Sequence, residues 1–401
     1  MKKKNLIIKN CIKKKYLKNK RFHSFSKNFE KIISDIKFKS NSPLEIYNLL
    51  NKNYKFNFKT SDLKIFKRFK SIAIIGMGGS ILGTEAIYEF LKIKIKKKIY
   101  FFDNINSDKI KEFKAKTKLD KTLFLIISKS GNTIETISNF LFLGIIKKNS
   151  KNIILISEKK QNFIYTLAKN YNLFYIEHKN YIGGRYSVLS EVGLVPAYLM
   201  NLNIKKLRNK TQYYLTNSRK KILKDNSIKM AVLLKNRIFK NLVLINYVPQ
   251  LEKFLYWSQQ LIAESLGKKG YGFLPIISNT PKDHHSLLQL YLDGPRDKVF
   301  SIFSFDEKSS SIIKTNKYNL KFKYLNNKSL SQIKFAQKNA LIECLKKNNI
   351  PFREFKIKKM TEDSLGELFA YFIIETIILG RLIGINPFDQ PSVEQVKKTT
   401  K

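Results

Sequence analysis

The 401-residue chain has very little cysteine, and its cysteines are poorly placed for a cross-link or a metal site. The two residues, Cys11 and Cys344, are far apart in sequence, and neither lies in a CxxC motif or in a metal-ligand spacing with histidine. A disulfide framework and a zinc site therefore have no support. We expect no metal ion and a reducing, cytoplasmic location.

Long apolar runs are also missing. No stretch approaches the ~18 uninterrupted apolar residues of a membrane-spanning helix. The most apolar candidate, Leu368–Ile383, is interrupted by Glu375, Gly380 and Arg381. The basic N-terminus lacks the sustained apolar core of a signal peptide. We therefore expect no membrane partner.

Acidic residues are scarce, because 30 Asp and Glu stand against 77 Lys and Arg, which gives a net charge of +47. Such a charge favours nucleic acid or an anionic membrane as a partner. The basic residues, however, are nearly all lysines spread along the chain, whereas arginine suits bidentate contacts to phosphates and bases. Arginines interleaved with aromatic residues for base stacking form no cluster. We interpret the charge as compositional drift, and we expect no specific nucleic-acid partner.

The chain does have enough apolar mass, 43% of its residues, to form real cores, and its length fits two domains. Short β-branched or aromatic runs alternate with helical patterns, which is typical of buried parallel strands. The predicted strands are Ile72–Ile75, Ile99–Phe102, Leu123–Ile127, Ile153–Ile156, Leu173–Ile176, Leu242–Ile245, Val299–Phe303 and Phe352–Ile357. We predict an α/β fold with two tandem, doubly wound parallel sheets and a C-terminal helix.

The composition and the strand pattern suggest where the domains divide. Residues 1–40 are rich in lysine and predict a basic arm or helix. The first α/β domain is expected over 41–203 and the second over 204–386, beginning with a helical stretch near Ile204–Lys235. Residues 387–401 form the expected C-terminal segment and helix.

Two segments join a predicted strand to a predicted helix and carry ligand-binding chemistry. Ile74–Gly83 is rich in glycine, which lets the backbone approach a ligand, but its GxGGS order differs from a dinucleotide-binding GxGxxG motif. Tight packing alone would also explain these glycines. Ile127–Thr136 offers three hydroxyls and a lysine at a helix start, which indicates a phosphate cradle rather than an ordinary helix cap. The cradle residues are Ser128, Lys129, Ser130 and Thr133.

Three further segments hold candidate catalytic residues. Arg185 follows two glycines that clear space for its guanidinium, although pairing with an acidic neighbour is the structural alternative. Gln260 and Glu264 are four residues apart and share one helix face, where a carboxylate can act as a general base or remain a solvated surface group. Two of the four histidines, His284 and His285, stand together; such a pair can move protons near neutral pH, or be only a loop feature.

Taken in this order, these segments resemble the phosphoglucose isomerase family over about 71–397. The most specific stretches are 180–190 (NYIGGRYSVLS) and 380–397 (GRLIGINPFDQPSVEQVK). The resemblance implies a pair of sugar isomerase domains, no cofactor, and interconversion of glucose 6-phosphate and fructose 6-phosphate through ring opening and a cis-enediolate, in glycolysis and gluconeogenesis. Ser392 departs from the family's usual Gly or Ala, a small change beside the site.

The resemblance also implies roles for individual residues. Glu264 matches the base that moves the proton between carbons 1 and 2, and Arg185 the group that stabilises the enediolate. His285, with Lys397, matches the ring-opening pair; in the family this histidine serves the neighbouring subunit of a homodimer. The positions expected to contact the sugar and its phosphate are Gly79, Ser80, Ser128, Lys129, Ser130, Thr133, Gln260 and Gln390.

Rival functions remain open at this stage. A dual glucose/mannose phosphate isomerase would differ only in pocket details. A glucosamine-phosphate synthase domain would need a glutaminase domain with an N-terminal cysteine. A non-catalytic sugar-phosphate-binding regulator would keep the cradle and lose Glu264, Arg185 or His285, all of which are present.

If the charge is compositional drift, added salt should act differently on nucleic-acid binding, on substrate affinity and on the catalytic rate. Nucleic-acid binding should be weak and abolished by moderate salt. The apparent affinity for an anionic sugar phosphate should weaken as the field is screened, while the rate per bound substrate changes little. A titration of potassium chloride in the isomerase assay, beside a nucleic-acid shift assay, measures both. Tight, sequence-preferring binding of nucleic acid at physiological salt would contradict this interpretation.

Overall fold

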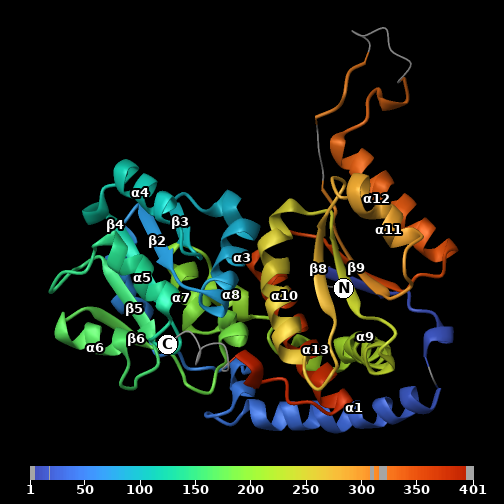
Figure 1. Cartoon of the computed structure of the whole chain (residues 1–401), viewed down its shortest axis with the longest axis horizontal. Coiled ribbons are helices and arrows are strands. Elements are labelled where there is room, and N and C mark those ends of the chain that lie inside the picture. The colour runs from blue at the N-terminus through green and yellow to red at the C-terminus, as the bar shows by residue number, and fades with distance from the viewer. Residues whose placement is uncertain (1–4, 18, 308–310, 316–322, 394–401) are drawn as a thin grey trace.

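The computed structural model describes residues 5–17, 19–307, 311–315 and 323–393. Two lobes lie side by side, and each contains a five-stranded sheet (Figure 1). The predicted fold class, α/β with two tandem sheets, is confirmed. The expected C-terminal helix is described only at its start, where residues 391–393 are helical, and Lys397 lies outside the described residues.

The first sheet is entirely parallel, with the strand order β3-β2-β4-β5-β6. Its central strand β4 (TLFLII) is buried at every position, as expected for a strand covered by helices on both faces. The strands are β2 (Ser71–Ile75), β3 (Lys98–Phe102), β4 (Thr122–Ile127), β5 (Ile153–Ser157) and β6 (Phe174–Glu177). All five contain a predicted strand or overlap one closely.

The second sheet has the order β1-β10-β9-β7-β8, and only its edge strand β1 is antiparallel. Neither edge strand of this sheet was predicted from the sequence. The first lies in the stretch interpreted as an arm or helix, and it pairs with β10. The strands are β1 (Leu6–Asn10), β7 (Asn241–Asn246), β8 (Leu274–Asn279), β9 (Lys298–Phe305) and β10 (Phe352–Ile357).

Thirteen α-helices in the described part of the chain surround the sheets. Those of the first lobe are α2 (Thr60–Leu63), α3 (Leu82–Leu91), α4 (Ser107–Lys116), α5 (Ile134–Leu143), α6 (Phe163–Asn170) and α7 (Glu191–Leu199), and the next helix, α8 (Ile204–Arg208), packs on α13. The others are α1 (Asn19–Ser40), α9 (Asn217–Asn236), α10 (Glu252–Leu266), α11 (His284–Leu292), α12 (Leu330–Lys347) and α13 (Glu362–Ile383). The helical stretch expected near Ile204–Lys235 is thus two helices, α8 and α9.

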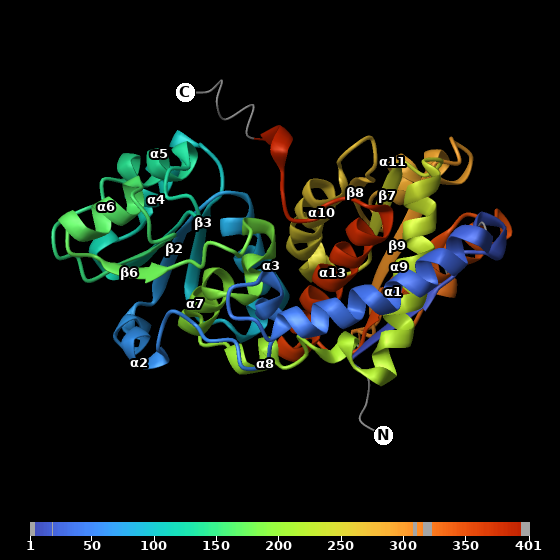
Figure 2. The same ribbon diagram turned by 90° about the horizontal axis from the view of Figure 1, so that it is seen from below.

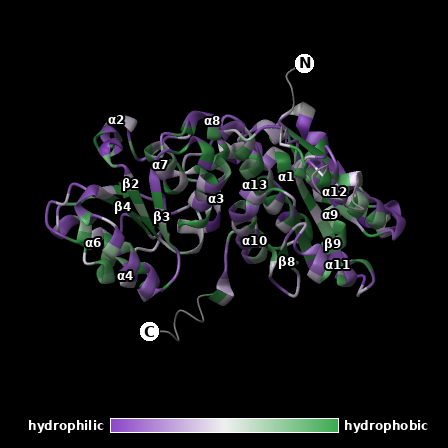
Figure 3. Ribbon diagram, turned by 90° about the horizontal axis from the view of Figure 1, so that it is seen from above, coloured by the Kyte–Doolittle hydropathy of each residue, from purple (hydrophilic) through white to green (hydrophobic). Residues whose placement is uncertain are grey.

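Helices α1 and α13 join distant parts of the chain. Helix α1 lies across α9 and α13 (Figure 2). Helix α13 is buried along nearly its whole length and contacts α8, α9 and α10. Hydrophobic residues concentrate on the strands of both sheets, and hydrophilic residues cover much of the outer helices and loops (Figure 3). The lysines therefore lie mainly on the surface, around an apolar core.

The lobes meet where α3 of the first packs on α10 of the second. An ion pair crosses this contact, because Lys253 Nζ lies 3.2 Å from Glu85 Oε1. The segment that follows α13 runs back past α10 (Figure 2). Three remote parts of the chain therefore meet here: the 3-10 helix Gly184–Leu189 before α7, helix α10, and this C-terminal segment.

Candidate active site

Arg185 is the centre of this convergence. It lies in a short 3-10 helix, Gly184–Leu189, and is 3% exposed. A buried guanidinium is costly unless its donors are satisfied. Its acceptors are Ser265 Oγ (2.8 Å), Glu264 Oε2 (3.2 Å), Gln390 Oε1 (3.0 Å) and the carbonyls of Pro387 (2.7 Å) and Asp389 (3.1 Å). Helix α10 and the C-terminal segment thus fix the guanidinium from two sides.

Glu264 projects from α10 toward Arg185. Its side chain is 28% exposed, so a ligand can still reach the carboxylate. Gln260 Nε2 donates to Glu264 Oε1 at 2.9 Å, as the four-residue spacing predicted. One carboxylate oxygen is therefore held by Gln260 and the other by Arg185. Gln260 Oε1 is buried and has no hydrogen-bond partner among the described residues, which leaves an acceptor for a ligand.

The glycine-rich turn packs closely against the backbone before Arg185 and against the Gln260 side chain. A Cβ on Gly79 would lie 2.2 Å from the carbonyl carbon of Gly184, directly before Arg185. Gly78 has φ +51°, and a Cβ there would lie 2.9 Å from Gln260 Nε2. These approaches require glycine. The next residue, Ser80, is half-buried in the same turn.

The predicted phosphate cradle forms a cluster of hydroxyls between β4 and α5. Ser128 Oγ lies 2.9 Å from Thr133 Oγ1, and Ser130 Oγ lies 3.4 Å from the same atom. Lys129 Nζ lies 3.5 Å from Glu158 Oε1. Burial lowers the pKa of the Lys129 ammonium, and the Glu158 carboxylate opposes that shift. The cluster offers hydroxyl donors and one cation at a helix start, which suits a phosphate.

His285 lies elsewhere, in the first turn of α11, and is exposed. In the described part of the chain, no hydrogen bond or ion pair joins it to Arg185 or Glu264. Its neighbour His284 is half-buried, with Nε2 2.9 Å from Tyr247 Oη, and burial lowers the pKa of its imidazole. The structure thus brings Arg185, Glu264, Gln260, Gly79 and Gln390 together and leaves His285 apart.

The residues that hold this arrangement in place were not predicted from the sequence. Trp257 Nε1 donates to the Arg185 carbonyl at 3.1 Å, and Tyr186 Oη donates to the Pro387 carbonyl at 2.9 Å. The chain has a single tryptophan, and its rarity was a signal that could have been used.

Lys268, just after α10, holds the C-terminal segment. Its ammonium donates to the carbonyls of Asn386 (2.6 Å) and Asp389 (2.5 Å) and to the Asp389 carboxylate (2.7 Å). This contact lowers the pKa of the Asp389 carboxyl. Because lysines occur everywhere in the chain, nothing in the sequence marked this one. We call residues 386–390 the strap, since Lys268 ties them beside Arg185.

Metal-ligand geometry is not found in the described residues, because nowhere do three or more His, Cys, Asp or Glu side chains gather to hold an ion. Among the same residues, no helix has the length and hydropathy to cross a membrane.

Comparison with known proteins gives a consistent result. A family model described as phosphoglucose isomerase matches residues 45–272. The chain is 34% identical to a probable glucose-6-phosphate isomerase of Methanococcus maripaludis, over 95% of this chain and 89% of that protein. It is 32% identical to the glucose-6-phosphate isomerase of Methanocaldococcus jannaschii, over 84% of each. A solved structure of a hypothetical protein from Thermus thermophilus has a TM-score of 0.83 at 23% identity, covering 98% of this chain and 99% of that one.

Replacing Lys268 with methionine should loosen the strap. The substitution keeps the apolar stem and removes three charge-assisted hydrogen bonds, so local opening should become easier by at least ~1.5 kcal/mol. Chymotrypsin cleavage after Phe388 should then accelerate about tenfold or more. Lys269→Met changes the adjacent exposed lysine and serves as the control. Equal cleavage rates in the two variants would show that Lys268 does not hold the strap.

Proposed function

This chain belongs to the phosphoglucose isomerase family, and we propose that Arg185 and Glu264 carry out its proton transfer. The protein interconverts glucose 6-phosphate and fructose 6-phosphate, an aldose–ketose isomerisation of glycolysis and gluconeogenesis that proceeds through an enediol intermediate. The observation that carries the residue assignment is the 3.2 Å contact between Arg185 Nη1 and Glu264 Oε2.

Glu264 is the general base of this proposal. The reaction removes a proton from carbon 2 of the open sugar and returns one to carbon 1. These carbons are adjacent, so one carboxylate can serve both. Gln260 and Arg185 each occupy one oxygen, and a carboxylate with about four acceptor sites keeps lone pairs free for the proton.

Arg185 stabilises the charge that this step creates. Taking the proton beside the carbonyl leaves negative charge on oxygen, and a fixed cation in a water-poor site lowers the energy of that state. The guanidinium is planar and presents its donors in a fixed fork, which suits it to an oxyanion. Its many fixed acceptors mean that little reorganisation is needed during the reaction.

The remaining site residues position the substrate. Ser128, Lys129, Ser130 and Thr133 hold the phosphate, and this remote binding energy orients the reacting carbons. The positions proposed to contact the sugar are Gly79, Ser80, Gln260 and Gln390. The contact of Gln390 with Arg185 supports this, because it brings the strap to the guanidinium that faces the substrate.

Ring opening is assigned to His285 together with Lys397. Because His285 is exposed and has no bond to the Arg185 cluster among the described residues, we place it in the active site of a neighbouring subunit. The working form is then a homodimer, located in the cytoplasm. Its subunits consist of an N-terminal segment (1–40), whose β1 pairs with β10 and whose helix α1 packs on α9 and α13, two sugar isomerase domains (41–203 and 204–386) and a C-terminal segment (387–401).

Glu264→Gln should abolish isomerisation and leave substrate binding largely intact. The amide keeps the shape and can still accept from Arg185, but it cannot take a carbon-bound proton, so kcat should fall by roughly a thousandfold. A coupled assay gives kcat and KM. Glu112→Gln, at a surface glutamate paired with Lys116, is the control. Activity within a few-fold of the unmodified enzyme would refute this role.

Mixed subunits test whether His285 acts on its neighbour. In a dimer of one Glu264→Gln and one His285→Ala subunit, one of the two sites keeps both groups if His285 acts in trans. Equal mixing should therefore restore about a quarter of full activity from two inactive variants. Refolding or subunit exchange followed by the coupled assay measures it. No recovery, or a fully active monomer, would contradict the arrangement.

A further inference from the structure

The second sheet has a counterpart of the place where the first sheet holds its phosphate cradle. In each doubly wound sheet the strand order reverses beside the first strand: between β2 and β4, and between β7 and β9. Ligands of such sheets bind at this reversal point, beyond the carboxyl ends of the strands. In the first sheet that position holds the glycine-rich turn after β2 and the cradle after β4.

Strand register makes the correspondence specific. Ser71 of β2 pairs with Thr122 of β4, and Asn241 of β7 pairs with Lys298 of β9. Thr122 and Lys298 therefore occupy equivalent positions. Six residues after Thr122 the first lobe has Ser128 of the cradle, and six residues after Lys298 the second lobe has Ser304. The second lobe thus has a serine hydroxyl where the first begins its cradle.

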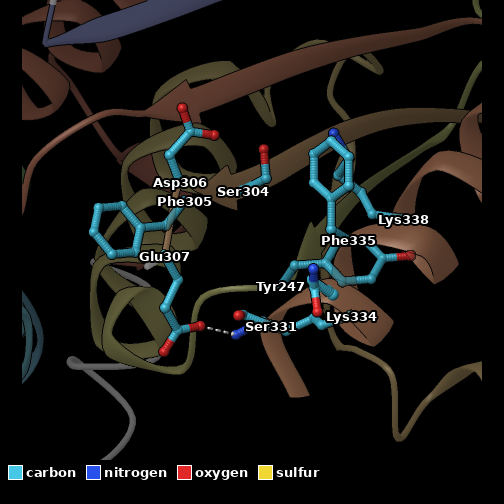
Figure 4. A pocket seen from close by; sticks show the side chains of 10 residues that line it. Tyr247, Ser304, Phe305, Asp306, Glu307, Ser331, Lys334, Phe335 and Lys338 are labelled. Atoms are coloured by element: carbon cyan, nitrogen blue, oxygen red, sulfur yellow. Dashed lines mark hydrogen bonds and ion pairs between the residues drawn. The ribbon is translucent and has the colours of Figure 1, made fainter. Parts of the chain in front are cut away.

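A cavity of about 400 Å³ lies at this point of the second lobe (Figure 4). Its size is that of a small-molecule site. The ends of β7 and β9 form one wall, and the first turns of α12 form the other. The residues around it are Tyr247, Ser304, Phe305, Asp306, Glu307, Ser331, Gln332, Lys334, Phe335 and Lys338.

Ser304 supplies the observation that points to a ligand. Its side chain is 5% exposed, and its Oγ has no hydrogen-bond partner among the described residues. In Figure 4 it lies between Asp306 and Phe335 at the cavity. A buried hydroxyl without a partner is costly, so a bound molecule that both donates and accepts here would remove that penalty.

The charges around the cavity are already paired. Glu307 binds Lys334 at 2.8 Å, and Lys338 binds Glu354 at 3.0 Å. Asp306 pairs with Lys356 of β10 and with Lys358, which directly follows that strand. An anion would have to separate these pairs or face their carboxylates. A neutral hydroxyl compound can instead accept from the ammonium groups and donate to the carboxylates while every pair stays intact.

Two features of α12 reinforce the preference for a neutral ring. The backbone N–H of Gln332 already donates to Ser329 Oγ in a capping box, so this helix start is poorly suited to a phosphate. The Phe335 ring is 48% exposed at the cavity, although the ammonium groups of Lys338 and Lys356 lie 4.7 and 5.7 Å from its centroid. It offers an apolar surface to the C–H face of a sugar.

We propose that this cavity is a second ligand site, separate from the isomerase centre, which binds an uncharged pyranose sugar. Ser304 Oγ exchanges hydrogen bonds with one ring hydroxyl, and the paired carboxylates and ammonium groups bind others. The sugar ring lies against Phe335. The site discriminates against phosphorylated sugars, which the first lobe selects.

Binding of methyl glucoside, whose ring cannot open, tests the proposal. The glucoside is titrated into the full chain under saturating glucose 6-phosphate, so that the isomerase centre is occupied, and saturation-transfer NMR follows the complex. Ser304→Ala should weaken binding roughly fivefold and leave the melting temperature equal or higher, because the removed hydroxyl had no protein partner. Phe335→Ala should weaken binding by a similar factor or more.

Matched control variants show whether a loss of glucoside binding comes from the cavity or from removing any similar side chain. Ser227→Ala removes another buried serine whose hydroxyl lacks a partner among the described residues, and Phe142→Ala removes a helical phenylalanine that is 50% exposed. Neither should change glucoside binding. No saturable binding to the unmodified chain, or equal weakening by the control variants, would overturn the proposal. Displacement of the glucoside by inorganic phosphate would show an anion site instead and would also overturn it.

Discussion

The buried guanidinium of Arg185 is the constraint on which the active site depends. It comes from the first lobe, but its acceptors belong to α10 of the second lobe and to the strap that follows α13. Losing one side of this arrangement would leave a buried charge uncompensated, at a cost of about 3–5 kcal/mol. The same contacts that keep three remote segments together therefore also bring the Arg185 guanidinium, the Glu264 carboxylate and Gln390 to one point.

The two sheets share an architecture but differ in the side chains at their reversal points. After β4 the chain presents Ser128, Lys129 and Ser130, small hydroxyls and a cation suited to phosphate. After β9 the equivalent serine is followed by Phe305, Asp306 and Glu307, an aromatic ring and carboxylates. In the two proposals above, a few residues at the ends of equivalent strands select the ligand class of each lobe, while the parallel strands beneath them keep an equivalent order.

Central strands could be predicted because they are continuous apolar runs, whereas edge strands depend on their neighbours. β1 (LIIKN) lies within a lysine-rich stretch and becomes a strand by pairing with β10. β8 contains Pro275, which an edge strand tolerates and a strand pattern does not suggest. In the site, Arg185 was recognisable because arginine is rare in this chain. Lys268 was not, because its role arises only when the strap folds back onto it.

An isotope-transfer experiment tests most directly the central claim that Glu264 moves the proton while Arg185 stabilises the negative charge. Glucose 6-phosphate labelled with deuterium at carbon 2 is converted in ordinary water, and NMR locates the label in fructose 6-phosphate. If one carboxylate carries the label between the two carbons, part of the deuterium should reach carbon 1 and part should exchange with solvent. Neither transfer nor exchange should occur in Glu264→Gln. Complete retention of deuterium under all conditions, or transfer that persists in Glu264→Gln, would contradict the account.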